Sequence, residues 1–280
     1  MLKKLLILFL FVGISSTINA QIKTPQPSPS SKLEQVVGLT DVTLEYSRPS
    51  MRGRTIFGNL VPYGKVWRTG ANANSKITFS DNVTIDGQEL KKGTYAIYTI
   101  PNETSWDVIF YSDSNNWGNP QKWDDAKVAV KTTVPSNVIE AKIESFTLEI
   151  NDIKSGEATL GILWDTIYVG VKFEVPTEAI TLKNIDAVMS GPSGNDYFEA
   201  ASYFHTEGKD LNKALAWMKK ATAGENPPFW YLRRMSLIQA DLGDKKGAIA
   251  TAKLSLAGAE KASNADYVKM NKESIAEWIK

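Results

Sequence analysis

The sequence predicts a mainly β protein with an α tail. It favours an antiparallel β-sandwich or jelly-roll-like domain over residues 33–178, followed by a helical-repeat region over 193–280. Two observations support this division. Apolar residues alternate with a period of two from about Leu33 to Pro176, and the period then becomes that of an amphipathic helix.

The β region divides into many short strands. The alternation is longest at its end, where Ile167, Val169, Val171 and Phe173 fall on one face. Strands are expected at 42–47, 76–80, 83–85, 88–90, 94–100, 106–111, 127–134, 140–150, 157–164 and 167–175. Most of the intervening turns are too short for parallel crossovers, which indicates antiparallel pairing.

The alternation changes phase by one residue between Ile143 and Phe146. A β-bulge produces such a slip, and so does a strand that passes from one sheet to the other. The sequence therefore predicts an irregularity within the strand at 140–150.

The C-terminal region contains an internal repeat. Ala214-Leu215 recurs 34 residues later as Ala248-Ile249, which is the tetratricopeptide period. A further helical stripe runs from Tyr267 to Trp278. We expect two tetratricopeptide-like helical hairpins plus a closing helix.

The N-terminus has the layout of a signal peptide over residues 1–20. Lys3 and Lys4 precede the apolar stretch Leu5–Ile14, and small or polar residues follow as far as Ala20. Residues 21–32, rich in proline and serine, are expected to form a disordered linker. The chain contains no cysteine, so disulfides, thiolate sites and a lipid-anchored N-terminus are not expected. We expect an exported, soluble, periplasmic or secreted protein that is not a lipoprotein.

The charge balance and the apolar stretches argue against nucleic acid and a membrane span, respectively. Lys and Arg total 32 against 31 Asp and Glu, and the expected cleavage removes two of the lysines. A nearly neutral chain has no overall field that attracts nucleic acid. Beyond the expected signal peptide, no stretch approaches the roughly twenty apolar residues of a membrane span.

An irregular segment at 48–74 interrupts the alternation and concentrates arginine, aromatic and amide side chains. Arginine binds carboxylates and phosphates through paired hydrogen bonds, and aromatic rings offer stacking faces. This pattern indicates an anionic or sugar ligand. The candidate ligand-binding residues are Arg52, Arg54, Tyr63, Trp67, Arg68 and Asn72. In the alternative interpretation, the apolar residues of the segment plug one end of the sandwich while its arginines pair with carboxylates.

A sequence motif within this segment resembles a known family. The run R-x-R-x-I-F-G-x-L-V-P-Y-G-x-V-W-R-x-G-A-N, from Arg52 to Asn72, is similar to the secreted bacterial domain-of-unknown-function family 2911. Further similar motifs are G-T-Y-x-x-Y-T-I-P at Gly93 to Pro101, Trp106, Trp117-Gly118 and Trp123. The resemblance covers about residues 33–175. It implies export and a β-rich domain, and it implies no reaction.

The sequence predicts no catalytic residues, metal site or cofactor. His205 is the only histidine, and its place in the helical repeat favours packing. The segment Asp113 to Asp124 only half-matches a calcium loop, because Trp117 occupies a ligand position. The pair Asp124-Asp125 alone does not indicate a glycosidase. No phosphate-binding or dinucleotide-binding glycine motif is present.

The favoured function is a non-catalytic binding or interaction protein of the cell envelope. The β domain would bind an anionic or sugar ligand at 48–74, and the helical tail would contact a protein partner. One alternative is a carboxylate-based hydrolase that acts on glycans or envelope material. Another is a β scaffold whose only binding surface is the protein-binding helical tail.

We predict that export removes the first twenty residues. Mass spectrometry of the extracytoplasmic fraction is expected to give an N-terminus at or close to Gln21, because small and polar residues precede it. Recovery of the intact chain from the cytosol would contradict this prediction.

Overall fold

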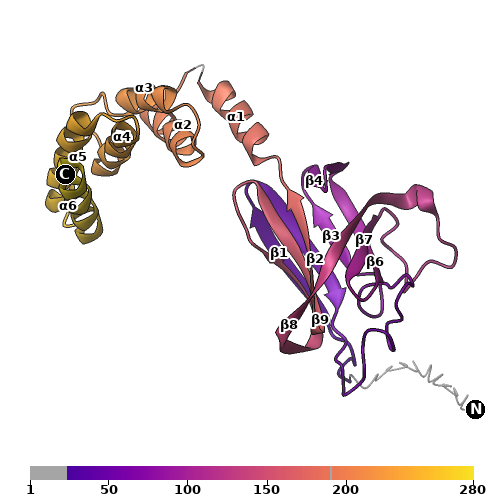
Figure 1. The fold of residues 1–280 in the computed structure, drawn as a ribbon. Helices are drawn as coiled ribbons and strands as arrows, with labels where there is room; N and C mark the ends of the chain where they lie inside the picture. The colour runs from indigo at the N-terminus through magenta and orange to yellow at the C-terminus, as the bar shows by residue number, and fades with distance from the viewer. Residues whose placement is uncertain (1–23, 190) are drawn as a thin grey trace, which may run out of the picture. The chain divides into compact units, whose positions relative to one another are not determined.

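The computed structural model describes residues 24–189 and 191–280, so the expected signal peptide at 1–20 lies outside the described residues. The chain divides into two compact units, one ending at Val175 and the other beginning at Pro176 (Figure 1). The fold class predicted from the sequence is confirmed, since an antiparallel β unit precedes an α-helical unit.

The β unit contains nine strands within the described residues. They are β1 (Ser30–Val37), β2 (Thr40–Ser47), β3 (Lys76–Phe79), β4 (Val83–Ile85), β5 (Gln88–Leu90), β6 (Gly93–Pro101), β7 (Ser105–Tyr111), β8 (Val128–Asn151) and β9 (Glu157–Glu174). A 3-10 turn, Asp125–Lys127, precedes β8. Their hydrogen-bonded order is β1-β2-β3-β6-β7-β8-β9-β4-β5, and every pairing is antiparallel.

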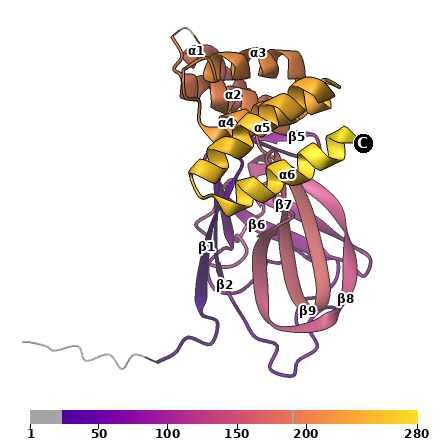
Figure 2. The ribbon, with the colours of Figure 1, turned by 90° about the vertical axis from the view of Figure 1, so that its left-hand side faces the viewer.

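Strand β8 joins the two layers of this unit. Its first part, Val128–Pro135, pairs with β7, and the part from Ser136 to Asn151 pairs with β9. The expected irregularity is present, because the register with β9 shifts on both sides of Ile143. Strand β8 therefore shows both features that the phase slip allowed: a register irregularity and a passage from one layer to the other. Figure 2 shows β8 and β9 as long, curved neighbours.

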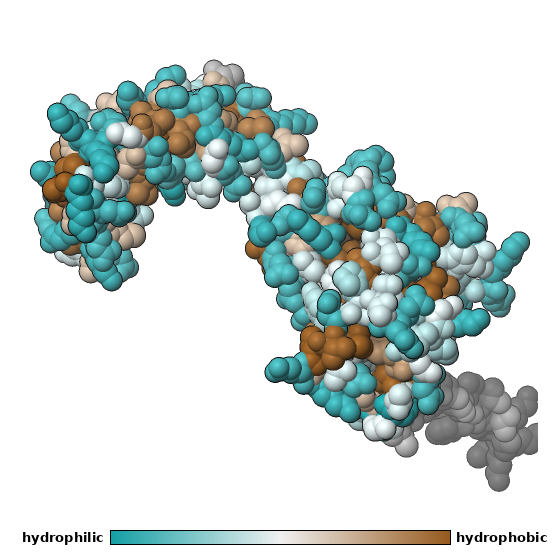
Figure 3. Space-filling model, in the orientation of Figure 1, coloured by the Kyte–Doolittle hydropathy of each residue, from teal (hydrophilic) through white to brown (hydrophobic). Residues whose placement is uncertain are grey.

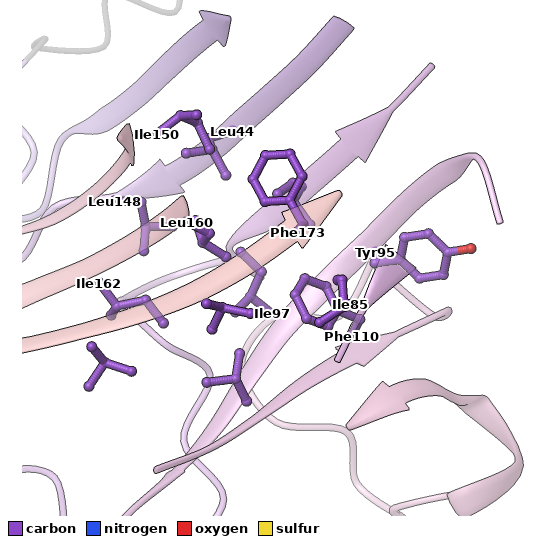
Figure 4. Packing of buried hydrophobic residues seen from close by; sticks show 14 of the residues in the cluster. Leu44, Ile85, Tyr95, Ile97, Phe110, Leu148, Ile150, Leu160, Ile162 and Phe173 are labelled. Atoms are coloured by element: carbon purple, nitrogen blue, oxygen red, sulfur yellow. The ribbon is translucent and has the colours of Figure 1, made fainter. Parts of the chain in front are cut away.

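The core lies between the layers and consists of the alternating residues. Leu44, Ile97 and Phe110 come from β2, β6 and β7, while Leu148 and Ile162 come from β8 and β9 (Figure 4). Each is at most 2% exposed. Burial of an apolar side chain of this size contributes about 1.5–3 kcal/mol, so the alternating pattern fixes which face of each strand turns inward.

The structure differs from the expected boundaries in several places. The strands expected at 127–134 and 140–150 form the single strand β8, and those expected at 157–164 and 167–175 form the single strand β9. The linker expected over 21–32 overlaps β1, where Ser30 pairs with Ser47 and Lys32 with Glu45. Backbone hydrogen bonds to β2 form this strand, and its first residues contribute little apolar burial. Helix α1 (Thr177–Val188) fills part of the interval between the two expected regions.

The helical unit follows the predicted repeat. Its helices after α1 are α2 (Gly194–Thr206), α3 (Leu211–Ala221), α4 (Phe229–Asp241), α5 (Lys245–Lys261) and α6 (Ala265–Ile279). Helices α2 and α3 pack as one hairpin, α4 and α5 as the second, and α6 packs on α5. The repeated Ala214 and Ala248 are both fully buried, as a small residue at a helix crossing requires.

Side-chain caps set the starts of these helices. Asp210, Asp244 and Asn264 each accept a hydrogen bond from a backbone N–H of the first turn. Ser193 forms a reciprocal capping box with Asp196. Each such cap contributes roughly 1 kcal/mol and marks where a helix begins.

No helix among the described residues is both long and apolar enough to cross a membrane. On the face shown in Figure 3, apolar side chains gather in several patches that polar side chains surround.

We predict that Phe146→Ala lowers the free energy of unfolding of the β unit by about 3–5 kcal/mol, because it opens a cavity in the core. Phe146 is fully buried, and its ring lies 5.4 Å from that of Trp67 and 5.8 Å from that of Trp164. Urea melts followed by tryptophan fluorescence measure the effect. Val138→Ala on the same strand is the control, since Val138 is 78% exposed and its loss is expected to cost less than about 0.5 kcal/mol.

Candidate functional site

A cavity of about 410 Å³ opens where the segment 48–74 meets β9 and the residues before β1. Its lining combines arginine, tryptophan, small and polar residues. The lining residues are Pro27, Ser28, Pro49, Ser50, Arg52, Arg54, Leu60, Val61, Trp67, Arg68, Gly70, Ala71 and Trp164. We refer to this cavity as the arginine pocket.

The irregular part of β8 holds the segment 48–74 in place through backbone hydrogen bonds. The backbone N–H of Met51 donates to the Glu144 carbonyl at 2.8 Å, and the N–H of Phe146 donates to the Pro49 carbonyl at 2.9 Å. Beyond these contacts, Ile56 and Val61 are buried in the core. The segment therefore does close one end of the sandwich, as the plug interpretation expects, and this packing fixes the position of the pocket.

Two tryptophan rings provide an apolar wall. Trp67 stacks on Trp164 with ring centroids 5.9 Å apart and an interplanar angle of 15°. The Trp164 indole N–H donates to the Glu144 carbonyl at 3.2 Å, which fixes the orientation of its ring. Phe57 packs edge-on against both rings. Both rings are thus held rigidly, and Trp67, which is half-buried, is the more accessible of the two because Trp164 is only 2% exposed.

The arginines of the pocket contact backbone carbonyls. The Arg52 Nη2 donates to Pro27 at 2.9 Å. Arg54 donates through Nε to Met51 at 2.8 Å and through Nη2 to Ser50 at 2.6 Å. A guanidinium has five N–H donors, so both groups retain donors beyond these bonds. These partners differ from the carboxylates that the plug interpretation requires.

Arg68 is half-buried, and one nitrogen of its guanidinium has no partner in the described part of the chain. Its Nε is buried and has no hydrogen-bond partner among the described residues. None of the described residues that line the arginine pocket has a carboxylate. Removing a cationic donor from water without a partner is costly, and an anion in the pocket would provide that partner.

Two of the six candidate residues lie outside the lining. The Tyr63 ring is partly exposed and packs beside Gly58, where a Cβ would lie 3.0 Å from its Cε2. Asn72 adopts a positive φ of 61°, and its Nδ2 donates to the Ser28 carbonyl and the Ser47 Oγ. Asn72 thus holds the chain beside the pocket. The structure brings together only Arg52, Arg54, Trp67 and Arg68.

Sequence reasoning missed the contributions to the lining from outside the segment. Trp164 belongs to the alternating pattern of β9 and resembles an ordinary core residue. Pro27 and Ser28 lie in the expected linker. No local feature of the sequence separates these residues from their neighbours, because only the tertiary fold brings them to the pocket.

The remaining polar motifs have structural partners. Asp113 forms a 2.8 Å ion pair with Lys127, and this hydrogen bond lowers the pKa of the Asp113 carboxyl. His205 lies between Asp241, 2.8 Å from its Nε2, and Arg234, 3.0 Å from its Nδ1. Among the described residues, no three His, Asp or Glu side chains are grouped as metal ligands.

Comparison with known proteins gives one match. The family model described as Protein of unknown function (DUF2911) matches residues 28–173, slightly more than half of the chain. No curated protein and no solved structure matches the chain. The matched range contains the arginine pocket except for Pro27.

We predict that EDTA leaves the melting temperature unchanged and that added calcium does not raise it. Asp113, the first acidic residue of the half-matched calcium loop, already has Lys127 as its partner. A thermal melt with and without each reagent checks the prediction. A large loss of stability in EDTA would show that the segment 113–124 holds a metal.

Proposed function

We propose that this chain, which belongs to the family Protein of unknown function (DUF2911), is an exported, non-catalytic protein that binds an anionic ligand in the arginine pocket. Export is proposed on the signal-peptide layout of residues 1–20. A place in the cell envelope, in the periplasm or outside the cell, is proposed on the same ground.

The unpartnered Nε of Arg68 is the observation that supports anion binding. The half-buried Arg68 has an unused Nε–H donor in a pocket whose described lining contains no carboxylate. A carboxylate or phosphate accepts two parallel hydrogen bonds from a guanidinium, so one acidic group on a ligand would satisfy this donor and add a second bond. Arg52 and Arg54 add positive potential at the same cavity.

The rest of the lining favours a small organic molecule over a bare ion. A volume of about 410 Å³ lies within the range of small-molecule pockets. Trp67 and Trp164 add apolar side chains to the same lining as the cationic groups. The combination suits a molecule with one acidic group and one flat or apolar face, such as an acidic sugar.

The hydrolase alternative has less support at this site. Such a mechanism needs two carboxyl groups that flank the scissile bond. The described lining contains none, and the neighbouring Glu144 accepts a hydrogen bond from the Arg52 backbone N–H at 2.9 Å. We therefore propose binding without chemistry in the arginine pocket.

A protein partner at the helical tail remains a second proposal. Exposed apolar side chains on three successive helices support it: Trp230 on α4, Leu254 on α5 and Ile279 on α6 are 44%, 62% and 68% exposed. Tryptophan is enriched at protein interfaces relative to the rest of the protein surface.

We predict that Arg68→Met abolishes stabilisation by anions while leaving the unliganded protein as stable as the wild type, or more stable. Methionine keeps much of the side-chain volume and removes the buried Nε–H that has no partner among the described residues. Thermal melts with citrate, phosphate and galacturonate give the measurement. At about one hundred times Kd, a ligand stabilises the wild type by ~2.7 kcal/mol.

Arg48→Met is the matched control. Arg48 donates to the Phe146 carbonyl at 3.0 Å and to the Thr147 hydroxyl at 2.7 Å, and it does not line the pocket. Its loss is expected to lower stability and to preserve the response to anions. If none of the three anions stabilises the wild type, or if Arg68→Met still responds, the arginine pocket is not an anion site.

A further inference from the structure

We propose that Trp117 extends the arginine pocket into a site for an acidic oligosaccharide. In this site one sugar places its acid group on Arg68, and a neighbouring sugar ring stacks on the Trp117 indole. The inference rests on the proposed function and deepens it by naming the ligand class and a second subsite.

Trp117 is displayed to solvent by a backbone that is held in place. Its side chain is 78% exposed, which is unusual for so large an apolar group. Asn74 is buried and bonds both neighbours of Trp117. Its Oδ1 accepts from the Asn116 N–H at 2.9 Å, and its Nδ2 donates to the Gly118 carbonyl at 3.0 Å.

Further contacts strengthen this attachment. Trp117 forms a backbone bridge with Ala73, and the buried Tyr98 hydroxyl donates to the Gly118 carbonyl at 3.2 Å. Burial raises the pKa of the Tyr98 phenol, which keeps its proton available for this bond. These bonds hold the backbone on both sides of Trp117 in place. A rigid backbone around an exposed indole is the arrangement of a preformed binding surface.

The same loop contacts the arginine pocket. A Cβ placed on Gly118 would lie 3.2 Å from the Arg68 Nη1, so the guanidinium lies directly against the residue that follows Trp117. Gly118 has a φ of 89°, which strains any other residue. Asn119 donates to the Val66 carbonyl at 2.9 Å and holds the loop to the part of the segment 48–74 that leads into Trp67 and Arg68.

These groups fit a saccharide chain. A sugar ring has an apolar C–H face that covers an exposed indole, and its hydroxyls bond to amides and ammonium groups. Beside Trp117, Lys76 donates to the Asn115 Oδ1 at 3.1 Å, and both side chains are polar groups at the outer surface. The guanidinium of Arg68 supplies the partner for the acid group of the adjoining sugar.

A length series of galacturonate tests the inference. Isothermal titration of the full chain with the monomer, dimer and tetramer is expected to show that the wild type binds the tetramer at least about tenfold more tightly than the monomer, equivalent to ~1.4 kcal/mol. In Trp117→Ala the tetramer is expected to bind no better than the monomer, while monomer affinity stays at its wild-type value. Trp117→Phe is expected to retain part of the gain.

Three controls make the outcomes distinct. Trp230→Ala removes a partly exposed tryptophan from the helical unit and is expected to change nothing. Neutral maltotetraose is expected to bind weakly, and tetra-aspartate is expected to show no dependence on Trp117. The oligosaccharide subsite is wrong if Trp117→Ala still binds the galacturonate tetramer more tightly than the monomer. It is also wrong if the affinity for tetra-aspartate depends on Trp117 as strongly as the affinity for the glycan does. If the monomer, citrate and phosphate all fail to bind the wild type, the proposed function itself is wrong.

Discussion

The register break in β8 is the constraint on which the pocket depends. In a regular antiparallel pair, the backbone groups near Phe146 would bond only to β9. Here the pairing moves from Ile143–Asp165 to Thr147–Leu163, which leaves two more residues on β8 than on β9 in between. The freed groups of Glu144 and Phe146 bond the segment 48–74 instead. An irregular segment of this length needs such partners, because buried backbone groups cannot remain unpaired.

A second consequence is that the pocket combines apolar packing with an arginine donor that has no partner. The fold stabilises the tryptophan wall through core contacts, so the wall needs no ligand to stay in place. The half-buried Arg68 keeps its Nε–H without a partner in the described structure. Sites that break the rule of paired buried donors are often functional, because a ligand can complete the interaction there.

Much of the fold was predictable because alternation reports burial directly. The strands that build the core lie close to their expected ranges, and the slip near Ile143 identified the irregular strand. Strand β1 and helix α1 were missed because their apolar pattern is weak. The motif at 48–74 located the pocket arginines, but long-range contacts place Trp164 there and leave Tyr63 and Asn72 aside. Ligand binding by the four candidates that line the pocket stays a prediction.

The residues just before β1 have a role that a linker would not have. Pro27 accepts a hydrogen bond from Arg52, Ser28 accepts one from Asn72, and Pro29 accepts one from the Arg48 N–H. Pro27 and Ser28 form part of the pocket wall, although all three residues precede the first strand of the sheet. Recombinant protein that starts at Ser30 would therefore keep its strands and lose one side of its pocket. A bulky affinity tag fused at Gln21 would place foreign residues only a few positions from the same opening.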